Sequence, residues 1–205
     1  MLHSLLLAQN KTVINKAHGI GYYSPYVAYS EMHMYNDNQI EHYRNKNKDI
    51  AYYILEEYIV KKINYGPDKK PAIVYIDHWI LERYSLFYEA DLQRETIRKL
   101  SEIGEHLNIP VYVKFSPHNS AADMKEFLKT YSHVSICTNI KELAATHNIL
   151  FVNLFSTAYY DFSKFGNVMF METDVFKPAA MFGSDIDRSN LENLEQNITQ
   201  KLLVN

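Results

Sequence analysis

A turn rich in hydrogen-bonding side chains joins an apolar run, residues 110–115, to an amphipathic stretch that begins at Ser120. The start of a helix presents free backbone N–H groups and the positive end of the helix dipole, and both favour an anion. Lys114 and His118 could add an ammonium and an imidazole there, and Ser120 a hydroxyl. The turn therefore predicts contacts to ligand phosphates, although an ordinary turn in which Ser120 only caps the helix fits the same residues.

A pair of hydroxyls follows a second apolar run. Ser156 and Thr157 come shortly after residues 149–154 and before a short helical stretch. Two hydroxyls at the end of a strand could bind a phosphate or a ribose, or could simply cap the next helix. The pair is a second candidate contact for the same anionic ligand.

A carboxylate and two histidines are the candidates for proton transfer. Asp77 follows the run 72–76, where it could act with His78 as an acid/base pair or form a salt bridge with Arg83. His18 stands in a His-Gly dipeptide, and the glycine would let a ligand approach the backbone closely. Asp77 and His18 are therefore the expected catalytic residues.

The elements that must position these residues alternate between strands and helices. The pattern predicts strands at 72–76, 110–115, 133–137, 149–154 and 167–171, and helices at 91–107, 120–131, 139–146 and 189–203. This alternation predicts an α/β fold, a three-layer Rossmann-like open sheet that is mostly parallel, with helices on both faces. Ligands of such sheets bind beyond the carboxyl ends of the strands, where the candidate residues lie.

The chain divides at a Gly-Pro-Asp turn that begins at residue 66. Residues 67–205 form the predicted Rossmann-like domain, and residues 1–66 are expected to pack on its core, with a strand near 12–14 and a long helix within 36–63. The apolar stretch 1–8 lacks a basic segment before it, so we interpret it as folded structure rather than a signal peptide. A cytoplasmic location is expected.

Composition excludes several classes of protein. Lys and Arg total 21 against 24 Asp and Glu, a net charge of −3, which does not favour nucleic-acid binding. No apolar run approaches the roughly 20 residues of a transmembrane helix. Cys137 is the only cysteine, and the nine histidines show no close pairing typical of metal ligands. No metal site is predicted, although a Mg²⁺ held by an aspartate and ligand phosphates stays open.

Several of these pieces follow a recognisable order along the chain. They are His18-Gly19, the run 72–76, the turn Lys114-Phe115-Ser116-Pro117-His118, the pair Ser156-Thr157, Asp161, Gly166 and the run 168–170. This order resembles the C-terminal, donor-binding half of GT-B glycosyltransferases that assemble bacterial surface polysaccharides. That group holds capsule, lipooligosaccharide sialyl- and CDP-glycerol-type transferases.

The resemblance implies that a nucleotide-activated sugar is the ligand and substrate, with no cofactor and no required metal. By the same resemblance, the donor would be bound by Lys114, His118, Ser120, Ser156 and Thr157, and catalysis would fall to Asp77 and His18. The chain departs from the family at the turn, which reads Pro117-His118 where the family has His-Pro. Its 205 residues are also few for two full domains. Either the N-terminal lobe is missing and a second copy or a separate partner lobe supplies it, or the chain is a reduced relative, or the resemblance is of fold alone.

Two other classes of protein fit the same pattern. SGNH-type hydrolases share a flavodoxin-like α/β fold of about this size, but no histidine follows His147 to complete their usual triad. A non-enzymatic partner-binding protein would account for the absence of nucleotide-binding glycine motifs. The tyrosine-rich stretch 22–29 would suit its interface. The sequence therefore leaves open whether the chain is an enzyme.

Overall fold

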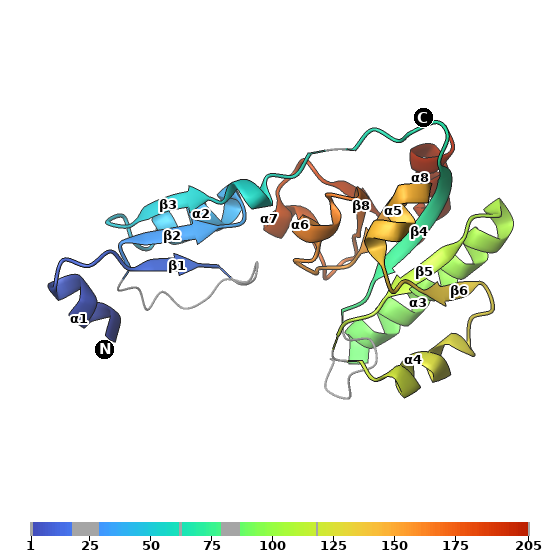
Figure 1. The fold of residues 1–205 in the computed structure, drawn as a ribbon, viewed down its shortest axis with the longest axis horizontal. Coiled ribbons are helices and arrows are strands. Elements are labelled where there is room, and N and C mark those ends of the chain that lie inside the picture. The colour runs from blue at the N-terminus through green and yellow to red at the C-terminus, as the bar shows by residue number, and fades with distance from the viewer. Residues whose placement is uncertain (1, 18–28, 62, 79–86, 118, 205) are drawn as a thin grey trace. The chain divides into compact units, whose positions relative to one another are not determined.

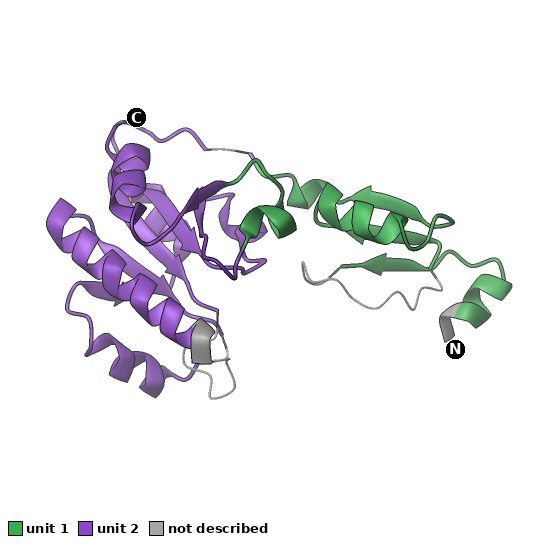
Figure 2. Cartoon of the chain, turned by 180° about the vertical axis from the view of Figure 1, so that it is seen from behind, with its two compact units in different colours: residues 1–60, 177–186 green, residues 61–176, 187–205 purple. Residues whose placement is uncertain are grey.

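The computed structural model describes residues 2–17, 29–61, 63–78, 87–117 and 119–204 (Figure 1). The chain forms two compact units, one of residues 1–60 with 177–186 and one of residues 61–176 with 187–205 (Figure 2). Each unit contains its own parallel sheet. No described helix is both long and apolar enough to cross a bilayer.

The larger unit is built on six parallel strands. They are β4 (Lys70–Ile76), β5 (Val111–Lys114), β6 (Val134–Ile136), β7 (His147–Asn153), β8 (Gly166–Met171) and β9 (Asp187–Ser189). Their spatial order is β6-β5-β4-β7-β8-β9, with every neighbouring pair parallel. Numbered within the unit this order is 3-2-1-4-5-6, that of dinucleotide-binding Rossmann folds, whereas flavodoxin-like sheets have the order 2-1-3-4-5. The flavodoxin-like alternative is therefore wrong for this unit.

Helices cover both faces of this sheet because alternate side chains of a buried strand point to opposite faces. On one face lie α3 (Phe87–Leu107), α4 (Ala121–Leu128) and α8 (Leu194–Leu202); on the other lie α5 (Ile140–Thr146) and α6 (Tyr159–Phe162). Ile73 of β4 shares one core with Leu100 of α3. Phe151 of β7 points the other way and stacks on Phe162 of α6, with ring centroids 5.3 Å apart. The predicted Rossmann-like α/β fold is confirmed.

The smaller unit contains a three-stranded sheet of its own. Strands β1 (Ile14–Lys16), β2 (Glu31–Met34) and β3 (Ala51–Ile54) lie in that order and are parallel. With them are α1 (Leu2–Ala8), α2 (Asp37–Arg44), the 3₁₀ turn η1 (Glu56–Tyr58) and α7 (Pro178–Phe182). The core is small and holds Met32, Met34, Ile40, Tyr43 and Ile50.

The long helix expected within residues 36–63 is wrong. Helix α2 ends at Arg44, and the next residues that form regular structure belong to β3. Residues 45–49 are all polar and include two asparagines and an aspartate, which favour turns, so they give a helix no apolar face to bury. The tyrosines that follow suit a strand.

Helix α7 joins this unit through asparagine side chains near the start of α2. The amide of Asn36 donates to the carbonyl of Met181 at 2.8 Å. The amide of Asn38 donates to the carbonyls of Ala179 and Ala180 at 3.2 and 3.1 Å. A segment late in the sequence thus completes a unit made mainly of early residues.

Candidate functional site

A cavity of about 320 Å³ opens at the carboxyl ends of β4, β5 and β7 in the larger unit. Strand β4 lies between β5 and β7 in the sheet. The strands that follow β4 in sequence, β5 and β6, lie on one side of it and the later strands lie on the other, so the strand order reverses at β4. Ligands of open α/β sheets bind at such a reversal. The cavity is lined by Ile76, Asp77, His78, Lys114, Phe115, Ser116, Pro117, Ser156, Thr157, Ala158 and Phe162.

The structure brings together Asp77, Lys114, Ser156 and Thr157 from three segments of the sequence. Ser120 is not among the lining residues. Its hydroxyl accepts the backbone N–H of Asp123 at 3.2 Å and caps α4. The other predicted positions, His18, His118, Arg83 and residues 22–28 of the tyrosine-rich stretch, lie outside the described residues. The roles assigned to these residues stay predictions.

Lys114 supplies positive charge to the cavity wall. It is the last residue of β5 and pairs in register with Ile76, the last residue of β4. Its ammonium donates to the carbonyl of Phe115 at 3.2 Å, which keeps the head group at the end of the strand. A partly buried ammonium in this position can donate charge-assisted hydrogen bonds to a phosphate.

A fully buried asparagine shapes the turn that carries the two hydroxyls. Asn153 ends β7, accepts the N–H of Ser156 at 3.0 Å and donates its amide to the carbonyl of Ser156 at 2.8 Å. The hydroxyl oxygen of Ser156 in turn accepts the N–H of Ala158 at 3.2 Å. Both main-chain groups of Ser156 are therefore fixed, and Thr157 follows from a defined turn at the cavity.

Asp77 lies in the cavity wall but is only 5% exposed. Its Oδ2 accepts the backbone N–H of Ser116 at 2.9 Å and the amide of Asn119 at 2.5 Å. Its own N–H donates to the carbonyl of Lys114 at 3.1 Å. The carboxylate thus links the end of β4 to the turn after β5.

His78, the possible acid/base partner of Asp77 in the sequence, also lines the cavity. Burial lowers the pKa of its imidazole to about 4, so the ring is neutral at pH 7. Its ring packs edge-on against Phe155, with centroids 4.0 Å apart. A neutral imidazole carries one hydrogen-bond donor and one acceptor, which is the complement of a hydroxyl group.

The main chain of His78 is held by Gln93, a fully buried residue of α3. The Gln93 side chain accepts the His78 N–H at 3.0 Å and donates to the His78 carbonyl at 2.8 Å. The hydroxyl of Tyr75 also donates to the side-chain oxygen of Gln93, at 3.3 Å. Gln93 could have been suspected from the sequence only as a polar residue beside Leu92 on the apolar face of the predicted helix.

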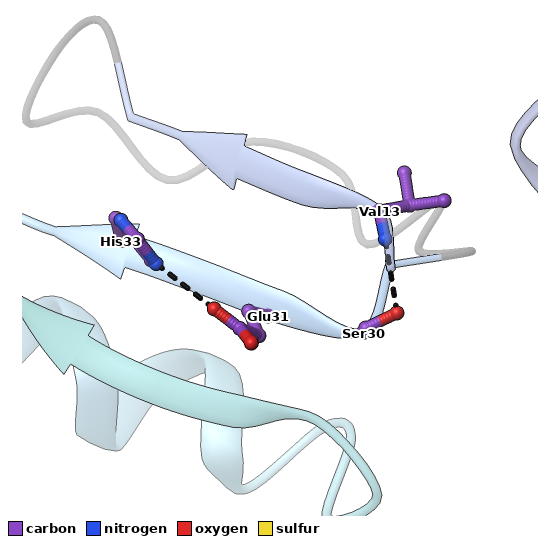
Figure 3. Close-up of polar contacts among 4 residues, drawn as sticks. All are labelled: Val13, Ser30, Glu31 and His33. Carbon is purple, nitrogen blue, oxygen red and sulfur yellow. Dashed lines mark hydrogen bonds and ion pairs between the residues drawn. The ribbon is translucent and has the colours of Figure 1, made fainter. Parts of the chain in front are cut away.

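A second polar cluster lies in the smaller unit (Figure 3). Nε2 of His33 is 3.2 Å from the carboxylate of Glu31, two residues earlier on β2. Nδ1 of His33 is buried and has no partner in the described part of the chain. The backbone N–H of Val13, just before β1, donates to the hydroxyl of Ser30, just before β2, at 3.0 Å.

No group of three metal-ligating side chains occurs among the residues that the structure describes. The cavity of the larger unit carries an ammonium, two hydroxyls and a buried carboxylate. An ammonium and hydroxyls are side-chain groups that suit a hydroxyl-bearing anion.

The fold has a counterpart among solved structures. No protein-family model matches the sequence. No curated protein matches it either. A chain in the crystal structure of the GtfA/B complex is similar to it, with a TM-score of 0.54 and 7% sequence identity over 96% of this chain.

The likeness supports the Rossmann-like α/β fold described above. The protein spans 46% of the length of that solved chain. At this identity the comparison bears on the fold alone, and it does not choose among the capsule, sialyl- and CDP-glycerol-type transferases named above.

Proposed function

We propose that the protein binds a nucleotide-activated sugar in the cavity of the larger unit, as the donor-binding part of a glycosyltransferase for surface-polysaccharide synthesis. The observation that carries this proposal is the meeting of Lys114, Ser156 and Thr157 at the reversal point of a Rossmann sheet. The glycosyltransferase-like fold supports it. Nucleotide sugars are made in the cytoplasm, so the cytoplasm is the proposed location.

The chemistry of sugar transfer explains why these side chains suit the task. When the bond between the anomeric carbon and the phosphate oxygen breaks, negative charge develops on the departing phosphate. The ammonium of Lys114 and the hydroxyls of Ser156 and Thr157 would stabilise that charge. Groups fixed before the reaction stabilise developing charge without reorganisation. The two hydrogen bonds from the Asn153 side chain to the main chain of Ser156 fix the turn that carries the hydroxyls.

The proposal is tested by measuring thermal stability with UDP, GDP, CDP, CMP and their sugar conjugates. A ligand that binds only the folded protein stabilises it by about 2.7 kcal/mol at a concentration 100 times its Kd. We expect at least one nucleotide to raise the melting temperature, and Thr157→Val to reduce that shift. If no nucleotide or nucleotide sugar raised the melting temperature, the proposal would be contradicted.

Binding alone does not establish transfer. Release of free nucleotide from the sugar conjugate that binds best measures whether the bond is broken. Release is expected in the presence of an acceptor extract, and slow hydrolysis to water in its absence.

A further inference from the structure

We propose that Asp77 is a positioning residue, which holds the turn after β5 in the shape that faces the ligand, rather than a base that touches the substrate. The inference rests on the proposed function for the identity of its ligand. The turn consists of residues 115–117 and Asn119 in the described part of the chain, and Phe115, Ser116 and Pro117 line the cavity.

The carboxylate of Asp77 is committed to hydrogen bonds within the protein. Its side chain is almost fully buried, and a buried carboxylate is costly unless donors surround it. Two donors reach its Oδ2, the N–H of Ser116 at 2.9 Å and the amide of Asn119 at 2.5 Å. Both belong to the turn, so the turn in this shape contributes to compensating the buried charge.

Two donors of the turn bind the carboxylate of Asp77. The main-chain N–H of Asp77 also donates to the carbonyl of Lys114, at the end of β5. Lys114 immediately precedes the turn and carries the ammonium proposed to meet the phosphate. A displacement of about 1 Å in a ligand-positioning group can cost up to 100-fold in function. The side chain of Asp77 therefore acts on the ligand through the turn, at Ser116 and Asn119.

A general base works differently. It needs a lone pair directed at the substrate hydroxyl, and its removal leaves donor affinity largely intact because the proton moves only during reaction. A positioning residue, in contrast, affects binding itself. Removal of its hydrogen-bond partner, here Asn119, should also weaken ligand binding.

The test compares Asp77→Asn, Asp77→Ala and Asn119→Ala with the wild-type chain. The first readout needs no ligand and is the hydrogen exchange of the Ser116 amide, measured by NMR. The second is the Kd of the nucleotide that gives the largest thermal shift, measured by calorimetry. Asn139→Ala is the matched control, because Asn139 caps α5 through the N–H groups of Lys141 and Glu142 and does not line the cavity.

We expect Asp77→Ala to speed Ser116 exchange and to weaken nucleotide binding, each by about tenfold or more. Asn119→Ala should weaken binding in the same direction, and Asp77→Asn, which keeps an acceptor for Ser116, should fall between Asp77→Ala and wild type. Unchanged Ser116 exchange in Asp77→Ala would overturn the proposal, as would unchanged affinity in both alanine variants. If the wild type binds no nucleotide, the proposed function fails, and Ser116 exchange still decides whether Asp77 holds the turn.

Discussion

The ammonium of Lys114 stands at the end of β5 in the cavity wall, where its charge can meet a phosphate. We predict that Lys114→Gln weakens nucleotide affinity by roughly 10- to 100-fold, the effect of losing one charge-assisted hydrogen bond. Lys125→Gln on α4, which is exposed and does not line the cavity, is the control. Calorimetric titration measures both, and equal affinities for the two variants would remove Lys114 from the site.

His78 makes stability depend on acidity. Burial lowers the pKa of its imidazole from 6.5 to about 4. The imidazole is therefore protonated in the unfolded chain below about pH 6.5, but in the folded chain only near pH 4 and below. The protein therefore loses stability as the pH falls through this window. The variant His78→Phe keeps a ring beside Phe155. We predict that between pH 7 and pH 4.5 its free energy of unfolding falls by roughly 2 kcal/mol less than that of the wild type. Urea unfolding at the two pH values measures it, and parallel losses would contradict it.

At the scale of elements, Gly166 sets the spacing between β7 and β8. A Cβ atom at this position would lie 2.2 Å from the backbone oxygen of Ile149, and backbone cannot move aside without breaking the ladder. We predict that Gly166→Ala costs roughly 3 kcal/mol of unfolding free energy or prevents folding. In Gly66→Ala the new methyl would meet only Lys69 at 3.9 Å, so a change within about 0.5 kcal/mol is expected. Urea unfolding of both variants decides the matter.

The elements that could be predicted from the sequence are those with a strong local pattern. Buried runs such as 149–154 became strands, and Ser120 caps α4 as its spacing to Asp123 suggests. Strand β9 was missed because it has three residues and no apolar run. The strands of the smaller unit were largely missed because β1 and β3 have few buried side chains.

The same contrast holds for the site. Asp77, Lys114 and Ser156 could be expected to meet because each lies at or just after the carboxyl end of a strand of one parallel sheet, and these strand ends gather at one edge. The partners that fix them could not be foreseen in this way. Asn119 reaches a carboxylate 42 positions away and Gln93 brackets a residue 15 positions away, so both contacts depend on packing between elements rather than on local pattern.

At the scale of the molecule, each unit has a core of its own. Met34 is 1% exposed and belongs to the core of the smaller unit, so we predict that Met34→Ala loosens that unit first. A buried methionine replaced by alanine costs about 2–5 kcal/mol. Hydrogen exchange followed by mass spectrometry should speed up in β2 and β3 more than in β4 and β7. Equal acceleration in both sheets would show that the two cores unfold together.

The contribution of α7 to the smaller unit has a consequence for how the chain is made. A ribosome releases residues in order, and domains generally fold as they emerge. The asparagines at 36 and 38 emerge early, but the carbonyls that they bind, at positions 179–181, follow only after most of the larger unit has been synthesised. The first unit to appear is therefore completed only after strands β4 to β8 of the larger unit have been synthesised, and until then its core lacks this helix.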